Sequence, residues 1–183
     1  FGYGQQLSIP HNVVPSKFPT GDADAAELAR MAIGQGSNQV TPLQMNMAAM
    51  AIANKGVIMK PNMIDKVIAP DLRVIEEPKP EKFSTATSPE IAGQLAELME
   101  GPVQHGTAMN AAVPGVDFRA KTGTAQLKVE DGVAYVNSWM TGFAPADDPQ
   151  VAITVTLQNV DYDTGHNTTG ALMKTMLKAV FNK

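Results

Sequence analysis

The chain has 183 residues and carries 14 lysines and arginines against 18 aspartates and glutamates, which gives a formal net charge of −4. Its hydrophobic fraction of 44 % is enough for a packed core, and its length predicts a single domain. The acidic balance argues against binding to nucleic acid, and no apolar run approaches the roughly 20 residues that a membrane-spanning helix needs.

Cysteine and histidine usage gives no sign of a metal or cofactor. The sequence has no cysteine, which excludes disulfides, thiolate nucleophiles and cysteine-ligated zinc. The histidines, His11, His105 and His166, share no ligand spacing, so we expect no metal and no cofactor. The chain begins at Phe1 with neither an initiator methionine nor a signal peptide, so we expect a fragment or a processed product of a longer protein.

The first predicted helix follows a Gly- and Pro-rich opening, residues 1–19, which we expect to be an extended loop. Residues 22–33 predict a short helix. Asp22 or Asp24 would cap its N-terminus, and Gly34 would end it.

The clearest predicted helix begins at Thr41. The sequence Thr41-Pro42-Leu43-Gln44 is typical of a capping box with proline at the first helical position. Apolar residues cover most of the following circumference, which predicts a buried helix, and Gly56 fits a left-handed cap at its end.

The middle of the chain predicts a hairpin and a further helix. Apolar runs at 63–68 and 73–76 flank Ala69-Pro70-Asp71-Leu72, which favours a hairpin, and residues 78–88 predict a loop. Thr87-Ser88-Pro89-Glu90 repeats the capping-box pattern and opens a helix that we expect to end near Gly101-Pro102. The apolar face of that helix is expected to be Ile91, Leu95, Leu98 and Met99.

From Val116 onward the pattern changes to strands. Residues 117–127 and 133–143 predict two strands joined by an Asp131-Gly132 turn, and 151–157 predict a third. Residues 168–181 predict a last helix with Leu172, Met176 and Val180 facing inward. The order of elements indicates an α+β fold, an antiparallel sheet covered by helices.

The motif that carries chemistry is Lys121-Thr122-Gly123-Thr124, at the centre of the first of these strands. A Lys-Thr-Gly triplet alone is a weak signal because a tripeptide recurs by chance. Here it lies on a predicted strand that a hairpin and a C-terminal helix follow. That setting is expected of the third motif of penicillin-recognising serine enzymes.

The whole chain resembles the C-terminal part of the transpeptidase domain of class B penicillin-binding proteins. The resemblance implies an α+β fold with an antiparallel sheet sandwiched by helices, as in serine β-lactamases, and residues 1–183 would be the C-terminal portion of one such domain. Ala120 stands where the family usually has Gly. The matching stretches are Phe1-Gly2-Tyr3-Gly4, Ala32–Gly36, Val40–Met45, Ala51–Gly56, Gly106-Thr107-Ala108, Lys121–Gln126 and Ser138–Pro145.

The same resemblance shows which motifs this sequence lacks. The family's nucleophile is the serine of a Ser-x-x-Lys motif, and its second motif is Ser-x-Asn. No serine of the chain has a lysine three places on or an asparagine two places on. In the family's order both motifs would lie upstream of Phe1, so we expect the chain by itself to be inactive.

By resemblance, the Lys-Thr-Gly motif would perform two tasks. Lys121 and Thr124 are the candidate catalytic residues: Lys121 would place positive charge beside the serine of the second motif, and the Thr124 backbone N–H would donate to the oxyanion. Thr122, Gly123 and Thr124 are the candidate substrate-binding residues. The two threonine hydroxyls would bind the substrate carboxylate, and Gly123 would let the peptide backbone approach the strand.

The resemblance implies a D,D-transpeptidase that cross-links peptidoglycan through a serine acyl-enzyme and is acylated by β-lactams. Its expected partners are the D-Ala-D-Ala stem peptide, β-lactam antibiotics and the upstream segment that carries the other two motifs. The family acts at the extracytoplasmic face of the bacterial cell membrane, tethered by an N-terminal segment.

Other interpretations stay open for the chain and for single residues. A serine β-lactamase or a β-lactam sensor would share the fold, and the absent nucleophile supports a non-catalytic pseudoenzyme or interaction module. Lys121 would without its context be a solvated strand lysine, and Trp139 is expected to pack against a helix rather than line a cleft. The strand at 151–157 would expose an apolar edge without the family's N-terminal strands, so we expect the chain to need an upstream segment for stability.

Overall fold

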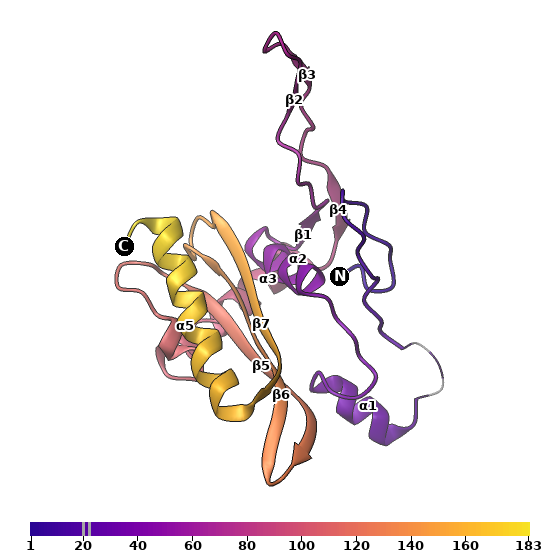
Figure 1. Ribbon diagram of the computed structural model, residues 1–183, viewed down its shortest axis with the longest axis vertical. Coiled ribbons are helices and arrows are strands. Elements are labelled where there is room, and N and C mark those ends of the chain that lie inside the picture. The colour runs from indigo at the N-terminus through magenta and orange to yellow at the C-terminus, as the bar shows by residue number, and fades with distance from the viewer. Residues whose placement is uncertain (20, 22) are drawn as a thin grey trace.

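In the computed structural model, which describes residues 1–19, 21 and 23–183, a three-stranded antiparallel sheet lies between two helices (Figure 1). Helix α5 (Tyr162–Phe181) covers one face and helix α2 (Pro42–Ala53) packs on the other. This arrangement confirms the α+β fold. Among the described residues, no helix is both long and apolar enough to span a membrane. The sheet has the order β5 (Arg119–Glu130), β6 (Val133–Ala144), β7 (Val151–Asp161).

The β5–β6 hairpin is the one that the sequence predicted. Asp131 and Gly132 both have positive φ, 49° and 78°, as a two-residue hairpin turn of mirror-image type requires. The register pairs Lys121 with Thr141 and Gly123 with Trp139. This pairing leaves β5 as an edge strand of the described sheet, with the Lys-Thr-Gly motif on it.

Helix α5 differs from the prediction in its start and in its buried face. It begins at Tyr162, where the Asp161 side chain accepts a hydrogen bond from Thr164 N over 2.9 Å. The residues predicted to face inward are instead partly exposed: Leu172 by 41 %, Met176 by 44 % and Val180 by 48 %. The buried face carries Gly165, Thr169, Gly170, Met173 and Leu177.

Close packing explains which face of α5 turns inward. A Cβ on Gly165 would lie 2.9 Å from Ser138 Cβ on β6, so the helix approaches the sheet at a distance that only glycine allows. Met173 and Leu177 then join Met140 and Ile153 in the main core. The predicted stripe has the same i, i+4 spacing but lacks the small residues, so spacing alone could not choose between them.

Helix α2 has the predicted start but only half of the predicted capping box. Thr41 Oγ1 accepts from Gln44 N over 3.2 Å. The reciprocal bond is absent, because the buried Gln44 side chain donates to Phe1 O and Thr41 N donates to Ser16 Oγ over 3.1 Å. The N-terminal segment is thereby tied to α2. Gly56 has a φ of +88°, as the predicted cap requires, and a Cβ there would lie 2.1 Å from Thr87 O.

Helix α3 (Pro89–Leu98) is capped by Ser88, which accepts from Ile91 N over 3.2 Å. The predicted inward face is partly wrong: Met99 is buried, but Ile91 and Leu98 are exposed. Ala92 is the residue of α3 that is buried, and α3 packs against α2. A separate turn, α4 (Gly101–Gln104), and the 3₁₀ turn η1 (Met109–Ala111) then lead to the sheet.

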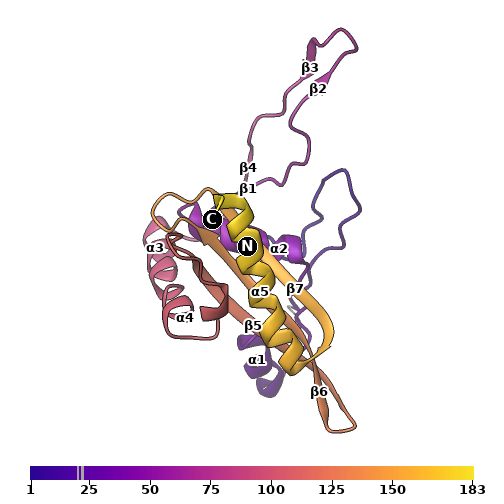
Figure 2. The same cartoon turned by 60° about the vertical axis from the view of Figure 1, so that its left-hand side comes forward.

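Part of the region predicted as a loop at 78–88 is a strand. β4 (Lys82–Thr85) pairs antiparallel with β1 (Val57–Met59), in the register Ile58 to Ser84. β1 lies far from β4 in the sequence, so no local pattern could predict that the two strands pair. Between them, β2 (Val67–Ile68) and β3 (Val74–Glu76) form the predicted hairpin, which extends away from the rest of the molecule (Figures 1 and 2).

Helix α1 (Ala25–Ala32) is shorter than the predicted 22–33 and begins after Asp24, whose side chain accepts from Glu27 N over 2.7 Å. The other candidate cap, Asp22, lies outside the described residues. Gly34 follows the helix with a φ of +79°, in agreement with its predicted role at the end.

Candidate active site

The Lys-Thr-Gly motif lies on the edge strand β5 with its side chains directed alternately to the two faces of the sheet. Thr122 pairs with Met140, which belongs to the core under α5. Lys121 pairs with Thr141, on the face where Thr154 bonds to Asn46 of α2 over 3.3 Å. Thr122 and Thr124 therefore share the α5 face, and Lys121 and Gly123 share the α2 face.

A pocket of about 50 Å³ lies beside the motif. Strands β5 and β6, the turn before η1 and the first turns of α5 form its walls, so segments far apart in the sequence meet here. Hydroxyl groups predominate among its side chains, which suits the pocket to a small polar or anionic group. Its lining residues are Thr107, Thr122, Gly123, Thr124, Ser138, Trp139, Met140, Tyr162, His166 and Thr169.

The Thr107 side chain is hydrogen-bonded to Thr122, the second residue of the motif. Thr107 Oγ1 lies 2.5 Å from Thr122 Oγ1, so the two hydroxyls share a hydrogen bond. Gly106 makes this turn possible, because a Cβ there would lie 2.8 Å from Pro102 Cα. Ala108 is fully buried in the core behind it. The Gly-Thr-Ala stretch, known from the sequence only through resemblance, thus positions a hydroxyl at the site.

Lys121 supplies positive charge at this edge of the sheet. Its side chain is exposed, and Nζ donates to the Thr122 carbonyl over 2.6 Å. Within residues 1–19, 21 and 23–183, no carboxylate lies within ion-pair distance of it. Arg119, two residues earlier, is by contrast paired with Glu100 and Asp117. The charge of Lys121 is therefore available to an anionic ligand.

Ser138 has a structural role in the pocket wall. It is buried, its Oγ donates to Gly165 O over 3.0 Å, and Thr169 Oγ1 lies 2.9 Å from it. These bonds join β6 to α5 and engage the Ser138 hydroxyl. Trp139 is among the residues that line the pocket, and its pairing with Gly123 puts it on the α2 face of the sheet, so its expected packing against a helix stays a prediction.

The start of α5 adds two ring side chains that sequence reasoning did not single out for the site. Tyr162 and His166 stack with their ring centroids 6.2 Å apart and their planes 1° from parallel. Both line the pocket opposite β5. The sequence carried no signal for them, because helix α5 was predicted to begin only at residue 168.

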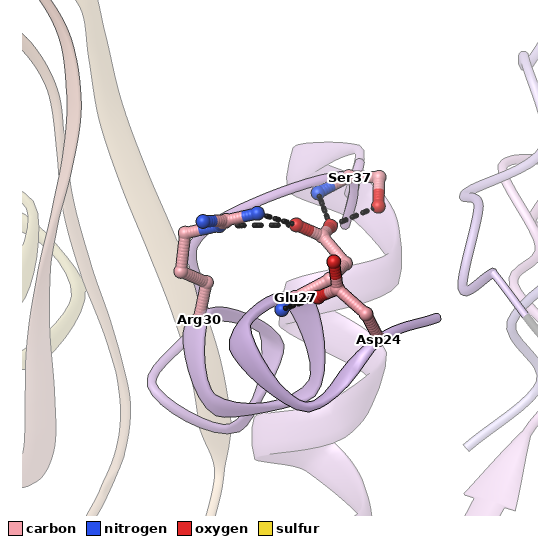
Figure 3. Close-up of polar contacts among 4 residues, drawn as sticks. All are labelled: Asp24, Glu27, Arg30 and Ser37. Carbon is pink, nitrogen blue, oxygen red and sulfur yellow. Dashed lines mark hydrogen bonds and ion pairs between the residues drawn. The ribbon is translucent and has the colours of Figure 1, made fainter. Parts of the chain in front are cut away.

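Gln35 reaches β5 from the loop that follows α1. Its Nε2 donates to Thr124 O over 3.2 Å. The loop is fixed to α1 through Glu27, which lies between Arg30 and Ser37 (Figure 3). Hydrogen bonds from Ser37 and then Arg30 lower the pKa of Glu27 to about 2. The stretch containing Gln35 contributed to the family resemblance, but nothing in it pointed to Thr124.

The Lys-Thr-Gly motif thus lies on an edge strand, with an exposed lysine and a pocket lined mainly by hydroxyl groups beside it. Residues 1–179 match the sequence family described as the penicillin-binding protein transpeptidase domain. The chain therefore belongs to this family, which confirms the resemblance.

Curated relatives agree with this assignment. The chain is 38 % identical over 136 residues to the peptidoglycan D,D-transpeptidase PbpA of Mycolicibacterium smegmatis, an alignment that covers 74 % of the chain and 28 % of that protein. It is 34 % identical over 165 residues to the stage V sporulation protein D of Bacillus subtilis, covering 87 % of the chain and 25 % of that protein. The chain thus spans about a quarter of the length of these relatives.

Solved structures show the same fold. The crystal structure of PBPA from Mycobacterium tuberculosis is similar with a TM-score of 0.85 at 29 % identity, over 98 % of the chain and 43 % of that structure. The imipenem acyl-enzyme complex of the same protein is similar with a TM-score of 0.82 at 30 % identity, over 98 % and 40 %.

Proposed function

We propose that residues 1–183 form the Lys-Thr-Gly wall of a D,D-transpeptidase active site that cross-links peptidoglycan and is acylated by β-lactams. The observation that carries this proposal is the motif on an edge strand, where the exposed Lys121 places Nζ against the Thr122 carbonyl and a pocket lined mainly by hydroxyl groups lies beside the same residues. The names of the relatives, peptidoglycan D,D-transpeptidases, and the acyl-enzyme complexes of the solved neighbours support it.

In this proposal the stem peptide adds to the edge of β5 as an extra strand, and main-chain hydrogen bonds position its terminal D-Ala-D-Ala. Thr122 and Thr124 bind the terminal carboxylate through their hydroxyls. Lys121 provides positive charge for this carboxylate and for proton transfer. The N–H of Thr124 donates to the oxyanion as it forms.

The nucleophile is proposed to come from an upstream segment with Ser-x-x-Lys and Ser-x-Asn motifs. Its serine Oγ would attack the carbonyl carbon between the two D-Ala residues, and the leaving D-Ala amine would take up a proton. The amine of a second stem peptide would then displace the serine and form the cross-link. A β-lactam would form the same serine ester by opening its ring, with the leaving nitrogen still attached. Residues 1–183 alone would form no acyl-enzyme.

The proposed substrate also sets the place of action. Peptidoglycan lies outside the cytoplasmic membrane, so we place the protein at the extracytoplasmic face of the membrane, tethered by an N-terminal segment. The partners in this proposal are the D-Ala-D-Ala stem peptide and β-lactam antibiotics.

A fluorescent penicillin tests the proposed function. The full-length protein and residues 1–183 are incubated with it and separated on a denaturing gel. Stable label on the full-length protein alone is the expected result. Label on residues 1–183 would overturn the assignment of the nucleophile to another segment. Rapid loss of the label would favour a β-lactamase, and no label on either would favour a pseudoenzyme.

A further inference from the structure

We propose that Gln35 gates the peptide-binding edge of β5: its side-chain amide occupies the Thr124 carbonyl in the unliganded protein and leaves when an N–H of the ligand takes that acceptor. This inference rests on the proposed function, because it concerns how a peptide or a β-lactam side chain pairs with the same strand.

The Gln35 side chain is hydrogen-bonded to the edge strand. Gln35 Nε2 donates to Thr124 O over 3.2 Å, although 89 positions separate the two residues in the sequence. Thr124 lies on the edge strand, where an added peptide strand finds its acceptors. The Gln35 amide and a ligand amide are therefore donors that compete for one carbonyl.

The backbone around Gln35 is held firmly on both sides, so its side chain is the part that can move. Gln35 N donates to Arg30 O over 2.9 Å, and Ser37 N donates to Glu27 Oε1 over 2.8 Å. Gly36 has a φ of +74°, a left-handed backbone conformation that favours glycine, and a Cβ on it would lie 2.6 Å from Glu27 Oε1.

The Gln35–Thr124 hydrogen bond is weak enough for a ligand N–H to replace it, although the loop keeps Gln35 in place. Arg30 Nη2 donates to Glu27 Oε2 over 2.6 Å, and this pair with the Ser37 bonds keeps Gln35 opposite β5. The Gln35–Thr124 bond is a neutral hydrogen bond at an exposed position, so exchanging it for a ligand N–H has a small free-energy cost. Removing the Gln35 side-chain amide should therefore raise the second-order rate constant for acylation, by about threefold to tenfold, with a ligand whose N–H binds the Thr124 carbonyl.

Two antibiotics separate this effect from a general change in the site. Penicillin G has an acylamino N–H beside its β-lactam ring, whereas imipenem has a hydroxyethyl group there. Second-order acylation rate constants are measured for the full-length protein and its Gln35→Ala variant with both compounds. We expect the ratio of the penicillin G constant to the imipenem constant to rise by about threefold to tenfold in the variant. Gln94→Ala, on the exposed side of α3, is the matched control.

A second variant, Gln35→Met, keeps the length of the side chain but lacks the donor, and it should give the same rise if Gln35→Ala unfolds. An unchanged or lower ratio in a protein that both antibiotics acylate would overturn the gate and leave the proposed function intact. A wild-type protein that neither antibiotic acylates would overturn the proposed function and the gate together.

Discussion

Thr107 Oγ1 lies 2.5 Å from Thr122 Oγ1, so the turn after α4 is bonded to the edge strand at the second residue of the Lys-Thr-Gly triplet. A hydroxyl donates one hydrogen bond and a carboxylate only accepts, so the Thr122 proton is left for a carboxylate when Thr107 is the donor in this contact. In the proposed function this contact would orient the Thr122 hydroxyl before a carboxylate binds, which would lower the cost of ordering the site.

Removing the Thr107 hydroxyl should loosen that orientation. We expect Thr107→Ala to lower the second-order acylation rate constant for penicillin G by about threefold to tenfold, the effect of one neutral hydrogen bond. Thr107→Ser, which keeps the hydroxyl, should stay near the wild type. Thr85→Ala, at an exposed position on β4, controls for the loss of a threonine elsewhere. Equal losses in the Ala and Ser variants would contradict the role of the hydroxyl.

Lys121 should contribute far more than a single neutral hydrogen bond. Its free charge lies where the proposed chemistry develops negative charge, so Lys121→Ala should lower the acylation rate constant by about a hundredfold or more. Lys128→Ala on the same strand is the matched control, because Lys128 is paired with Glu130 over 2.5 Å. Similar acylation of the two variants would show that Lys121 is only a solvated strand lysine.

Two glycine substitutions should change stability in opposite directions. Gly56→Ala places a Cβ 2.1 Å from the Thr87 carbonyl and at a φ of +88°. We expect it to lower the free energy of unfolding by at least about 2 kcal/mol. Gly93 lies within α3, and a Cβ there would meet nothing within 4 Å. Gly93→Ala should raise stability by up to about 1 kcal/mol, the helix-propensity difference. Urea unfolding of the full-length variants measures both, and a tolerated Gly56→Ala would show that this backbone turn can relax.

Glu27 should make stability depend on acidic pH. Hydrogen bonds from Ser37 and Arg30 lower its pKa to about 2 in the folded chain, while a glutamate in an unfolded chain titrates near 4.3. Its stabilising contribution is therefore complete above the unfolded pKa and is lost as pH falls through the folded one. The difference in unfolding free energy between wild type and Glu27→Gln should be largest at neutral pH and shrink as pH falls from the unfolded pKa toward the folded one. A difference that does not vary between pH 6 and pH 2 would contradict this pairing, and Glu97→Gln, exposed on α3, is the control.

Residues 1–183 alone should be poorly stable. β7 has a partner on one side only within the described chain, and an unpaired strand edge promotes association. Large apolar side chains are also exposed on the β2–β3 hairpin, among them Ile68, Leu72 and Ile75. Size-exclusion chromatography and thermal unfolding should show aggregation or a broad transition for this segment. A monodisperse sample with a cooperative transition would contradict the need for an upstream segment.

Much of the fold could be predicted from the sequence because its signals are local. The caps at Thr41 and Ser88 and the Asp131-Gly132 turn each depend on residues within one turn of the chain, and all three are present. The strand around the Lys-Thr-Gly motif followed from the same kind of local pattern. The family assignment followed from short stretches that keep their order along the chain.

The tertiary structure decided everything that depends on two distant segments meeting. The inward face of α5 was mispredicted, and two contacts were unforeseen: the pairing of β4 with β1 and the hydrogen bond from the Gln44 side chain to Phe1 O. In each case the partner lies elsewhere in the sequence. The candidate site shows the same division. The sequence by itself predicted Lys121 to Thr124 as site residues, because the motif lies within one strand and the family resemblance gives these positions a role. Only the folded chain brought Thr107, His166 and Gln35 to that strand, because side chains from other segments reach it only when the sheet and its covering helices pack.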